Sequence, residues 1–152
     1  MEKTDDKDLA LNYYQALAEF RYQIRRFVRF SEQLARAKGI EPQQHQLLLA
    51  IKGLPNGKKA TISELAERMQ LQHHSIVELV DRLVEHGFVE RQRDTDDQRR
   101  VLVHLTSQGG EILQQLSIVL LAELRQNGPT LVNTLSDLLL QEGLTMPDEP
   151  TG

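Results

Sequence analysis

Hydrophobic positions recur at helical spacing over the first third of the chain. Apolar side chains repeat every three or four residues from Asp8 to Lys38, the pattern of an amphipathic helix. Gly39 follows as a stop signal. Pro42 suits the first turn of a second helix that continues to Lys52. We therefore expect one long helix and one short helix before the turn cluster Leu54–Gly57.

Two shorter helices are predicted next. Thr61 and Glu64 have the spacing of a capping box, in which each side chain accepts a hydrogen bond from the other residue's amide. This box predicts a helix from Ile62 to Met69, and a further helix runs from about His73 to His86. Its expected buried stripe is Ile76, Leu79, Val80 and Leu83. The Lys58-Lys59 pair before the box is expected to be solvated.

The periodicity then changes from helical to alternating. A strand begins at Phe88–Glu90, and a second strand covers Val101–Leu105. The highly charged segment 91–100 between them predicts a hairpin tip, with Asp94 and Asp96 solvated. A helix capped by Thr106-Ser107 follows, and we expect Gly128-Pro129 to break it before a last helix.

Two short helices joined by a tight turn and followed by a charged hairpin form the pattern of a winged helix-turn-helix. The predicted fold is mainly α with a small β-hairpin wing, and long terminal helices flank the lobe. We expect these segments: 1–38, an N-terminal dimerisation helix; 39–106, the DNA-binding lobe; 107–142, C-terminal dimerisation helices; 143–152, a tail.

Composition narrows the function classes. Hydrophobic residues make up 39% and aromatic residues 5%, so aliphatic side chains must build the core. The net charge of -4 argues mildly against non-specific coating of nucleic acid, although a local basic patch can still bind it. The chain has no Cys, which excludes disulfides and zinc–thiolate sites. Neither a secretory signal nor an apolar run of roughly 20 residues is present, so we expect a cytoplasmic protein without a membrane partner.

Enzyme chemistry has no support in the sequence. We find no phosphate-binding glycine loop, nucleophile motif or metal cluster, and we expect no cofactor. The adjacent His73 and His74 point about 100° apart on a helix and lack a third ligand. His45 and His104 are expected to be ordinary, partly exposed side chains.

The order of these elements indicates DNA binding. An α-helix fits the major groove, and a slim loop that carries arginine suits the narrower minor groove. Asp97 lies two residues before Arg99, where its carboxylate can hold the guanidinium by charge-assisted hydrogen bonds. A winged-helix module that binds protein instead of DNA is the alternative. Such a module has no need of four arginines in one hairpin, namely Arg91, Arg93, Arg99 and Arg100.

Several segments resemble the MarR family of transcriptional regulators. The family signature, D-x-R followed by an alternating strand that ends in Leu-Thr, is matched by Asp97-Gln-Arg99-Arg-Val-Leu-Val103-His-Leu105-Thr106. Ile62-Ser-Glu-Leu-Ala66, Leu79-Val-Asp-Arg-Leu83, Gly87-Phe-Val-Glu-Arg91 and Leu105-Thr106-Ser-Gln-Gly109 are similar too. The resemblance implies a homodimer whose terminal helices interlock. It also implies a repressor that binds a pseudo-palindromic operator, with the helix after Gln72 in the major groove and Arg99 in the minor groove.

The candidate DNA contacts follow from this resemblance and from helical geometry. Val77 and Glu78 depart from the family pattern, in which a hydroxyl residue and a polar or basic residue are usual. Val77 could touch a thymine methyl group, and Glu78 could accept from cytosine N4. The predicted set is Ser63, Gln72, His73, His74, Ser75, Val77, Glu78, Arg82, Arg91, Arg93, Asp97, Arg99 and Arg100.

The resemblance further implies a small aromatic or phenolic effector that releases the DNA. In the family such compounds bind between the dimer helices and the DNA-binding lobe. The candidate lining residues in this chain are Tyr13, Tyr14, Phe20, Arg21 and His45.

Overall fold

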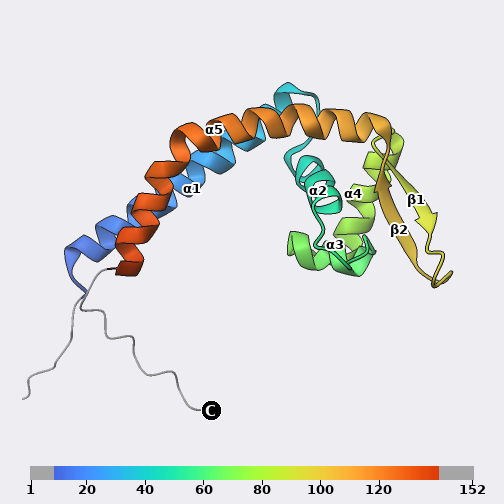
Figure 1. The fold of residues 1–152 in the computed structure, drawn as a ribbon, viewed down its shortest axis with the longest axis horizontal. Helices are drawn as coiled ribbons and strands as arrows, with labels where there is room; N and C mark the ends of the chain where they lie inside the picture. The colour runs from blue at the N-terminus through green and yellow to red at the C-terminus, as the bar shows by residue number, and fades with distance from the viewer. Residues whose placement is uncertain (1–8, 141–152) are drawn as a thin grey trace, which may run out of the picture. The chain divides into compact units, whose positions relative to one another are not determined.

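A computed structural model describes residues 9–140 of the chain. These residues form five helices and one hairpin, which are labelled in Figure 1. In chain order the elements are α1 (Leu11–Ala37), α2 (Pro42–Lys52), α3 (Ile62–Met69), α4 (His73–Glu85), β1 (Val89–Arg93), β2 (Val101–Leu105) and α5 (Ser107–Leu140). The predicted fold class is confirmed. The predicted tail, residues 143–152, lies outside the described residues.

The chain forms two compact units. Residues 30–121 make the first, here called the lobe. In the second, residues 9–29 of the chain, mostly α1, pair with residues 122–140 of α5, and we call these the helical ends. The four segments expected from the sequence stay a prediction, because α1 and α5 each contribute to both units.

The core of the lobe is aliphatic. Leu47 and Leu48 of α2, Leu65 of α3 and Leu116 of α5 are fully buried. The predicted stripe on α4 is confirmed, since Ile76, Leu79, Val80 and Leu83 are all buried. α4 packs against α2, α3 and β1 through this stripe, so its opposite face is left to the solvent.

One buried residue in α2 contradicts its predicted environment. His45 is expected to be partly exposed, yet its side chain is completely buried and neither ring nitrogen has a hydrogen-bond partner. Burial lowers the pKa of His45 below its ordinary value of 6.5, because desolvation disfavours the charged imidazolium. The helical pattern of α2 places this position on the buried face, next to Leu48 and Ile51, whatever residue occupies it.

The start of α3 confirms half of the predicted capping box. The Thr61 hydroxyl accepts from the Glu64 amide at 3.1 Å. The predicted second bond, from the Thr61 amide to the Glu64 carboxylate, is wrong, because the Thr61 amide donates to the Lys59 carbonyl at 2.8 Å. The Glu64 carboxylate instead accepts from Arg68 Nε at 3.1 Å, since a cation one turn along is a stronger partner than a backbone amide.

The hairpin is attached to the lobe at its middle and at its base. β1 and β2 pair antiparallel, with Val89 opposite Leu105 and Arg93 opposite Val101. The Val103 amide of β2 donates to the Ala60 carbonyl at 3.0 Å. At the base, the Thr106 amide donates to the Phe88 carbonyl at 3.0 Å, and the Thr106 hydroxyl donates to the Gly87 carbonyl at 2.6 Å. We call residues 89–105 the wing and residues 94–100 the wing tip.

Gly109 closes the base of the wing. A Cβ atom at this position would lie 2.0 Å from the Phe88 carbonyl oxygen, far inside any real contact. The neighbouring Gly110 has open space around its own Cβ position. Only a glycine at 109 therefore allows α5 to start this close to the wing.

α5 corrects the expected helix break. Its helix continues from Ser107 to Leu140 with Pro129 inside it. A proline lacks the amide that would donate to the carbonyl four residues earlier, and its ring crowds the Cβ of the residue before it. Gly128 has no Cβ, which removes that part of the clash. Leu-rich flanks on both sides favour the helix enough for it to pass this point.

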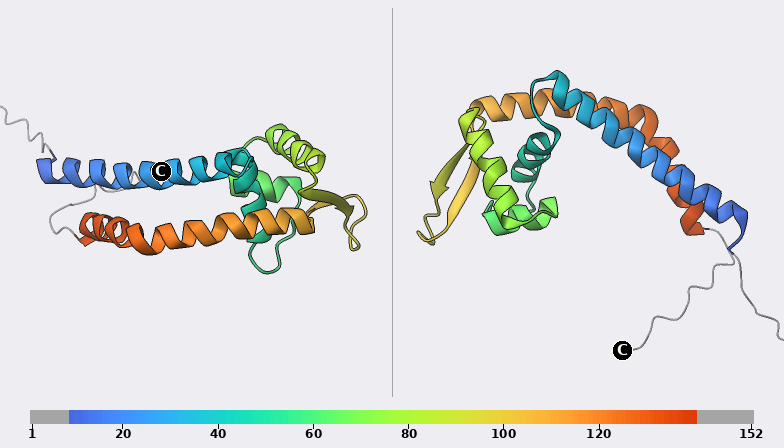
Figure 2. Two further views of the ribbon diagram at one scale, coloured as in Figure 1. Left: turned by 90° about the horizontal axis from the view of Figure 1, so that it is seen from above. Right: turned by 180° about the vertical axis from the view of Figure 1, so that it is seen from behind.

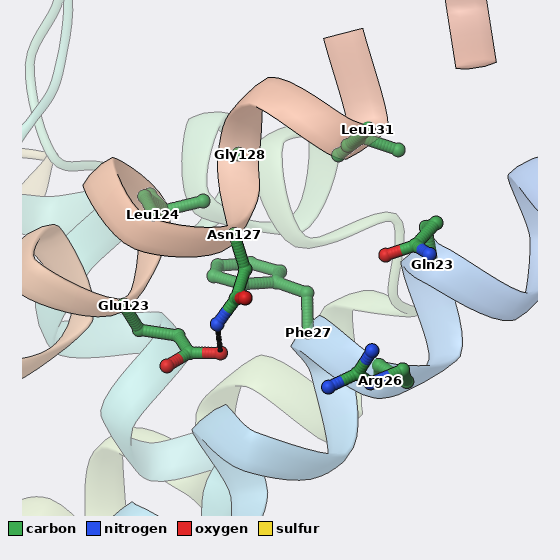
Figure 3. Close-up of a pocket in the computed structure, with 8 residues that line it drawn as sticks. All are labelled: Gln23, Arg26, Phe27, Glu123, Leu124, Asn127, Gly128 and Leu131. Carbon is green, nitrogen blue, oxygen red and sulfur yellow. Dashed lines mark hydrogen bonds between the residues drawn. The ribbon is translucent and has the colours of Figure 1, made fainter. Parts of the chain in front are cut away.

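The helical ends consist of two antiparallel segments. The start of α1 lies beside the end of α5, as both views of Figure 2 show. Phe27 of α1 points toward Asn127 and Gly128 of α5, where a cavity of about 20 Å³ remains (Figure 3). The Asn127 amide donates to the Glu123 carboxylate at 2.6 Å within α5. This cavity holds about one water molecule and is far smaller than a pocket for an aromatic ligand.

Candidate nucleic-acid interface

The outer face of α4 carries most of the predicted base and phosphate contacts. His73, His74, Glu78 and Arg82 are exposed, while Ser75 and Val77 are half-buried. Gln72 precedes the helix and makes no capping bond with its side chain. Within residues 9–140, the four exposed side chains form no hydrogen bond or ion pair with the rest of the lobe. These four side chains are therefore free to meet another surface.

The turn between α3 and α4 forms a groove beside this face. Gln70 ends α3 in the left-handed conformation, with φ of 51°, and its side chain donates to the Glu67 carbonyl at 2.9 Å. Ser63 on α3 and Ser75 on α4 line the same groove, together with Gln72 and His73. The two predicted phosphate-contacting serines are thus brought together by the turn.

The wing tip presents Arg99 to the solvent. Asp97 Oδ1 accepts from the Arg99 amide at 3.1 Å and from Arg99 Nε at 3.4 Å, so the predicted contact is confirmed. Arg100 Nε approaches the other oxygen of the same carboxylate at 3.5 Å. The Arg99 side chain is 93% exposed. Asp97 therefore orients the Arg99 guanidinium, and the side chain stays exposed to the solvent.

The other two arginines of the wing have internal partners. Arg91 on β1 pairs with Asp81 on the outer face of α4. Arg93 Nη1 donates to the Gln98 carbonyl at 2.8 Å and so braces the tip from within. Because Arg99 and Arg100 pair with Asp97, each of the four arginines has a partner within the lobe, and Arg91 is the one whose partner lies on a helix. Their contact with DNA stays a prediction.

Lys59 forms a cluster with two carboxylates that the sequence suggested were solvated. Its ammonium group donates to both oxygens of Asp94, at 2.9 and 3.0 Å, and to Asp96 Oδ2 at 2.7 Å. Asp94 is buried, with only 3% of its surface exposed. Hydrogen bonds to Asp96 and Asp94 raise the pKa of Lys59, and the bond from Lys59 lowers the pKa of Asp94.

Sequence reasoning missed this cluster because nothing local signals it. Lys59 and Asp94 are 35 residues apart, and each lies in a segment rich in charge. The expectation that Lys59, Asp94 and Asp96 are simply solvated is wrong. The fold brings the loop before α3 against the wing tip, and a buried carboxylate there requires a partner.

The predicted effector residues lie in both units. Tyr13, Tyr14, Phe20 and Arg21 belong to the helical ends, where Tyr14 and Arg21 are exposed. His45 belongs to the lobe and is enclosed by it. Whether these five side chains line one pocket stays a prediction.

The described part of the chain offers neither a candidate metal site nor a candidate membrane-spanning helix. Residues 9–140 contain no group of three or more His, Cys, Asp or Glu side chains that could hold a metal ion. Among the same residues, no helix is both long and apolar enough to cross a membrane.

Sequence comparison agrees with the geometry of the lobe. A sequence model of the MarR family matches residues 38–100, the stretch from the end of α1 to the wing tip. The lobe of this chain is therefore similar to the MarR family, whose members are transcriptional regulators. The expectation that the chain is not an enzyme agrees with this similarity.

A curated relative matches part of the chain. It is the proposed transcriptional regulatory protein for the hcr operon of Thauera aromatica, which is 31% identical over 96 residues. The match covers 63% of this chain and 56% of the relative, so the chain spans just over half of that protein.

Two solved structures resemble the MarR fold of this chain over most of its length. AbsC, a MarR family transcriptional regulator from Streptomyces coelicolor, has a TM-score of 0.70 at 17% identity, covering 88% of this chain and 93% of AbsC. A mutant of E. coli MarR complexed with operator DNA has a TM-score of 0.62 at 28% identity. That match covers 78% of this chain and 86% of the E. coli chain.

Proposed function

We propose that this protein is a transcriptional regulator that binds double-stranded DNA sequence-specifically as a homodimer. The observation that carries the proposal is the pairing of two free surfaces on one lobe. The outer face of α4 is exposed on a helix, the element that fits the major groove, and the Arg99 side chain is exposed on the wing of the same lobe. The similarity to a MarR protein solved on operator DNA supports the same mode.

The helical ends support the dimer. Leu11, Val132 and Leu139 are more than half exposed in the single chain, at 70%, 61% and 74%. Isolated chains seldom leave apolar residues exposed along two paired helices, because such patches promote association. A second copy that packs its own helical ends against these residues would cover them.

A two-fold dimer predicts the form of the DNA site. Two lobes related by a two-fold axis bind two half-sites of opposite orientation, about 10 base pairs apart. The operator should therefore be a pseudo-palindrome. Occupying such a site near a promoter blocks transcription, so we propose repression as the outcome and the cytoplasm as the place of action.

An effector would complete the regulator. A small aromatic or phenolic acid that binds the dimer better than the DNA complex would lower the affinity for the operator. The exposed Tyr14 and Arg21 supply an aromatic face and a cation for such a ligand. Melting temperature and operator affinity, measured across a panel of aromatic acids, test this part.

The decisive experiment removes the exposed charge of the wing. Selection from a random DNA pool first supplies an operator for the parent protein. Arg99→Ala should then weaken operator binding strongly, and the slope of log affinity against log salt should fall by up to about one unit for each phosphate that is no longer neutralised. Arg99→Lys should also bind less well, because an ammonium lacks the planar fork. Titration at two salt concentrations gives both quantities.

Arg25→Ala is the matched control. It removes the same charge from an exposed position on α1, far along the chain from the wing, and should leave operator affinity nearly unchanged. If no DNA is enriched, or if Arg99→Ala binds like the parent, the chain is a winged-helix module for another partner. A protein-binding module would then be the function to pursue.

A further inference from the structure

Three consecutive residues before α3 hold three different parts of the lobe. Lys59 binds the wing tip through Asp94 and Asp96. The Ala60 carbonyl accepts from Val103 in the middle of β2, and the Thr61 hydroxyl caps α3. The helix-turn-helix and the wing are therefore connected by neighbouring residues of one short segment.

The wing tip is ordered by a chain of hydrogen bonds that starts at Asp94. The Asp94 carboxylate accepts from the Asp96 amide at 3.0 Å, and the Asp94 amide donates to the Arg100 carbonyl at 3.0 Å. The Arg100 amide in turn donates to the Asp97 carbonyl at 2.9 Å. Asp97 then directs Arg99. The carboxylate that Lys59 binds is thus the buried origin of the turn that presents Arg99.

We propose that Lys59 is a positioning residue for DNA binding. Its ammonium group holds the wing tip at a fixed position relative to α3, so that the Arg99 side chain projects from a defined place on the lobe. The inference rests on the proposed function for its consequence on DNA. Its structural half, the ordering of the tip by Lys59, does not depend on DNA.

Lys59 differs from an ordinary phosphate-binding lysine in how its hydrogens are used. An ammonium group has three donors, and Lys59 makes three contacts of 2.7 to 3.0 Å with carboxylate oxygens. The two Asp94 oxygens lie too close together to take separate hydrogens, so at least two of the three hydrogens are directed at carboxylates and at most one is left for another partner. Lys58, the preceding residue, is largely exposed, and within residues 9–140 its ammonium group approaches the Glu64 carboxylate at 3.9 Å. The two lysines carry the same charge at neighbouring positions, which makes Lys58 a matched control.

The first measurement uses the protein without DNA. Lys59→Met should speed hydrogen exchange at the amides of Asp96 and Arg100, which are both held by the tip network, by roughly tenfold or more. Asp94→Asn should do the same, because it weakens the acceptor for Lys59. Lys59→Arg should restore slow exchange, and Lys58→Met should leave it unchanged. Melting temperature shows that each variant is folded.

The second measurement asks whether Lys59 acts through Arg99. Lys59→Met should lower operator affinity roughly tenfold in the parent, within the usual range of coupling between residues of one network. In an Arg99→Ala background it should have no further effect, because the side chain that it positions is gone. Lys58→Met should change affinity by the same factor in both backgrounds.

Each failure has a distinct meaning. Unchanged exchange at Asp96 and Arg100 in Lys59→Met overturns the structural half of the proposal. Additive losses from Lys59→Met and Arg99→Ala overturn the positioning role, since Lys59 would then contact DNA directly. If the parent binds no DNA, the proposed function fails and the consequence for DNA fails with it, while the exchange result still decides whether Lys59 orders the tip.

Discussion

The lobe and the helical ends are built from the same aliphatic residue types, but they bury them to very different degrees. Leu47, Leu65 and Val103 of the lobe have no exposed surface, whereas Leu139 of the helical ends is 74% exposed. The lobe folds around its own side chains from several elements. The helical ends have only two segments, which cannot enclose an apolar stripe between them. An apolar stripe in the sequence thus predicts a buried helix face. It does not tell whether residues of the same chain or of another chain bury that face.

Truncating one leucine in each region should give the largest contrast. Leu65→Ala should lower the free energy of unfolding by about 3 kcal/mol, because it leaves a cavity in a fully buried core. Leu135, at 39% exposure, should show a smaller effect from the same change in the single chain. Denaturant unfolding monitored by circular dichroism measures both values.

Protein concentration sharpens this contrast. The destabilisation by Leu65→Ala should be similar at low and high protein concentration, because its contacts lie within one chain. The destabilisation by Leu135→Ala should grow with concentration if the helical ends associate as proposed, because association stabilises the folded state by mass action. An effect of Leu135→Ala that does not vary with concentration would place its contacts within the single chain.

Adding one methyl group at the base of the wing should be nearly as damaging. Gly109→Ala should cost about 2 kcal/mol or more, because its Cβ would lie 2.0 Å from the Phe88 carbonyl oxygen and α5 would have to move away. Gly110→Ala adds the same atom where nothing lies within 4 Å. It should be neutral or stabilise α5 by about 0.5 kcal/mol. Thermal melts of the two variants check this pair, and equal destabilisation would contradict it.

The smallest expected effect on stability concerns His45, the buried histidine in the core of the lobe. The lowered pKa of His45 means that the unfolded chain binds a proton more readily, so stability is complete above pH 6.5 and falls as pH decreases below it. His45→Leu should remove this acid sensitivity and add about 1 kcal/mol at neutral pH by deleting unpartnered polar atoms.

His104→Leu is the control for that pH dependence. His104 lies exposed on β2, and its replacement should leave the acid sensitivity as in the parent. Unfolding curves at about pH 5 and about pH 7.5, on either side of the ordinary histidine pKa, compare the three proteins. A parent that is equally stable at both values would contradict the role given to His45.

Local patterns in the sequence were sufficient for most of the lobe. The predicted helix Ile62–Met69 is confirmed at both ends, and the predicted stripe on α4 is buried as expected. These features depend on residues within one or two turns of each other, which a single sequence displays. The contact between Asp97 and Arg99 could be predicted for the same reason.

What could not be predicted depends on residues far apart in the chain. The partner of Asp94 lies 35 residues earlier, and the partner of Arg91 lies on the preceding helix. Nothing in a charged hairpin reveals which of its arginines pairs with a residue of another element. The expected break at Pro129 was wrong for another reason, since a local breaking signal was outweighed by the helix on both sides.

The segment Lys59–Thr61 also determines where the chain tolerates changes in length. Residues 55–58 form an exposed turn, and Gly57 in it has a φ of 84° with nothing near its Cβ position. Insertions or peptide tags there should lengthen a surface loop at little cost. One residue inserted between Lys59 and Thr61 would instead change the spacing of three contacts. The ion cluster of Lys59, the hydrogen bond from β2 and the Thr61 cap of α3 could then not all form at once. Related chains should therefore vary in length before this segment and keep its three-residue span.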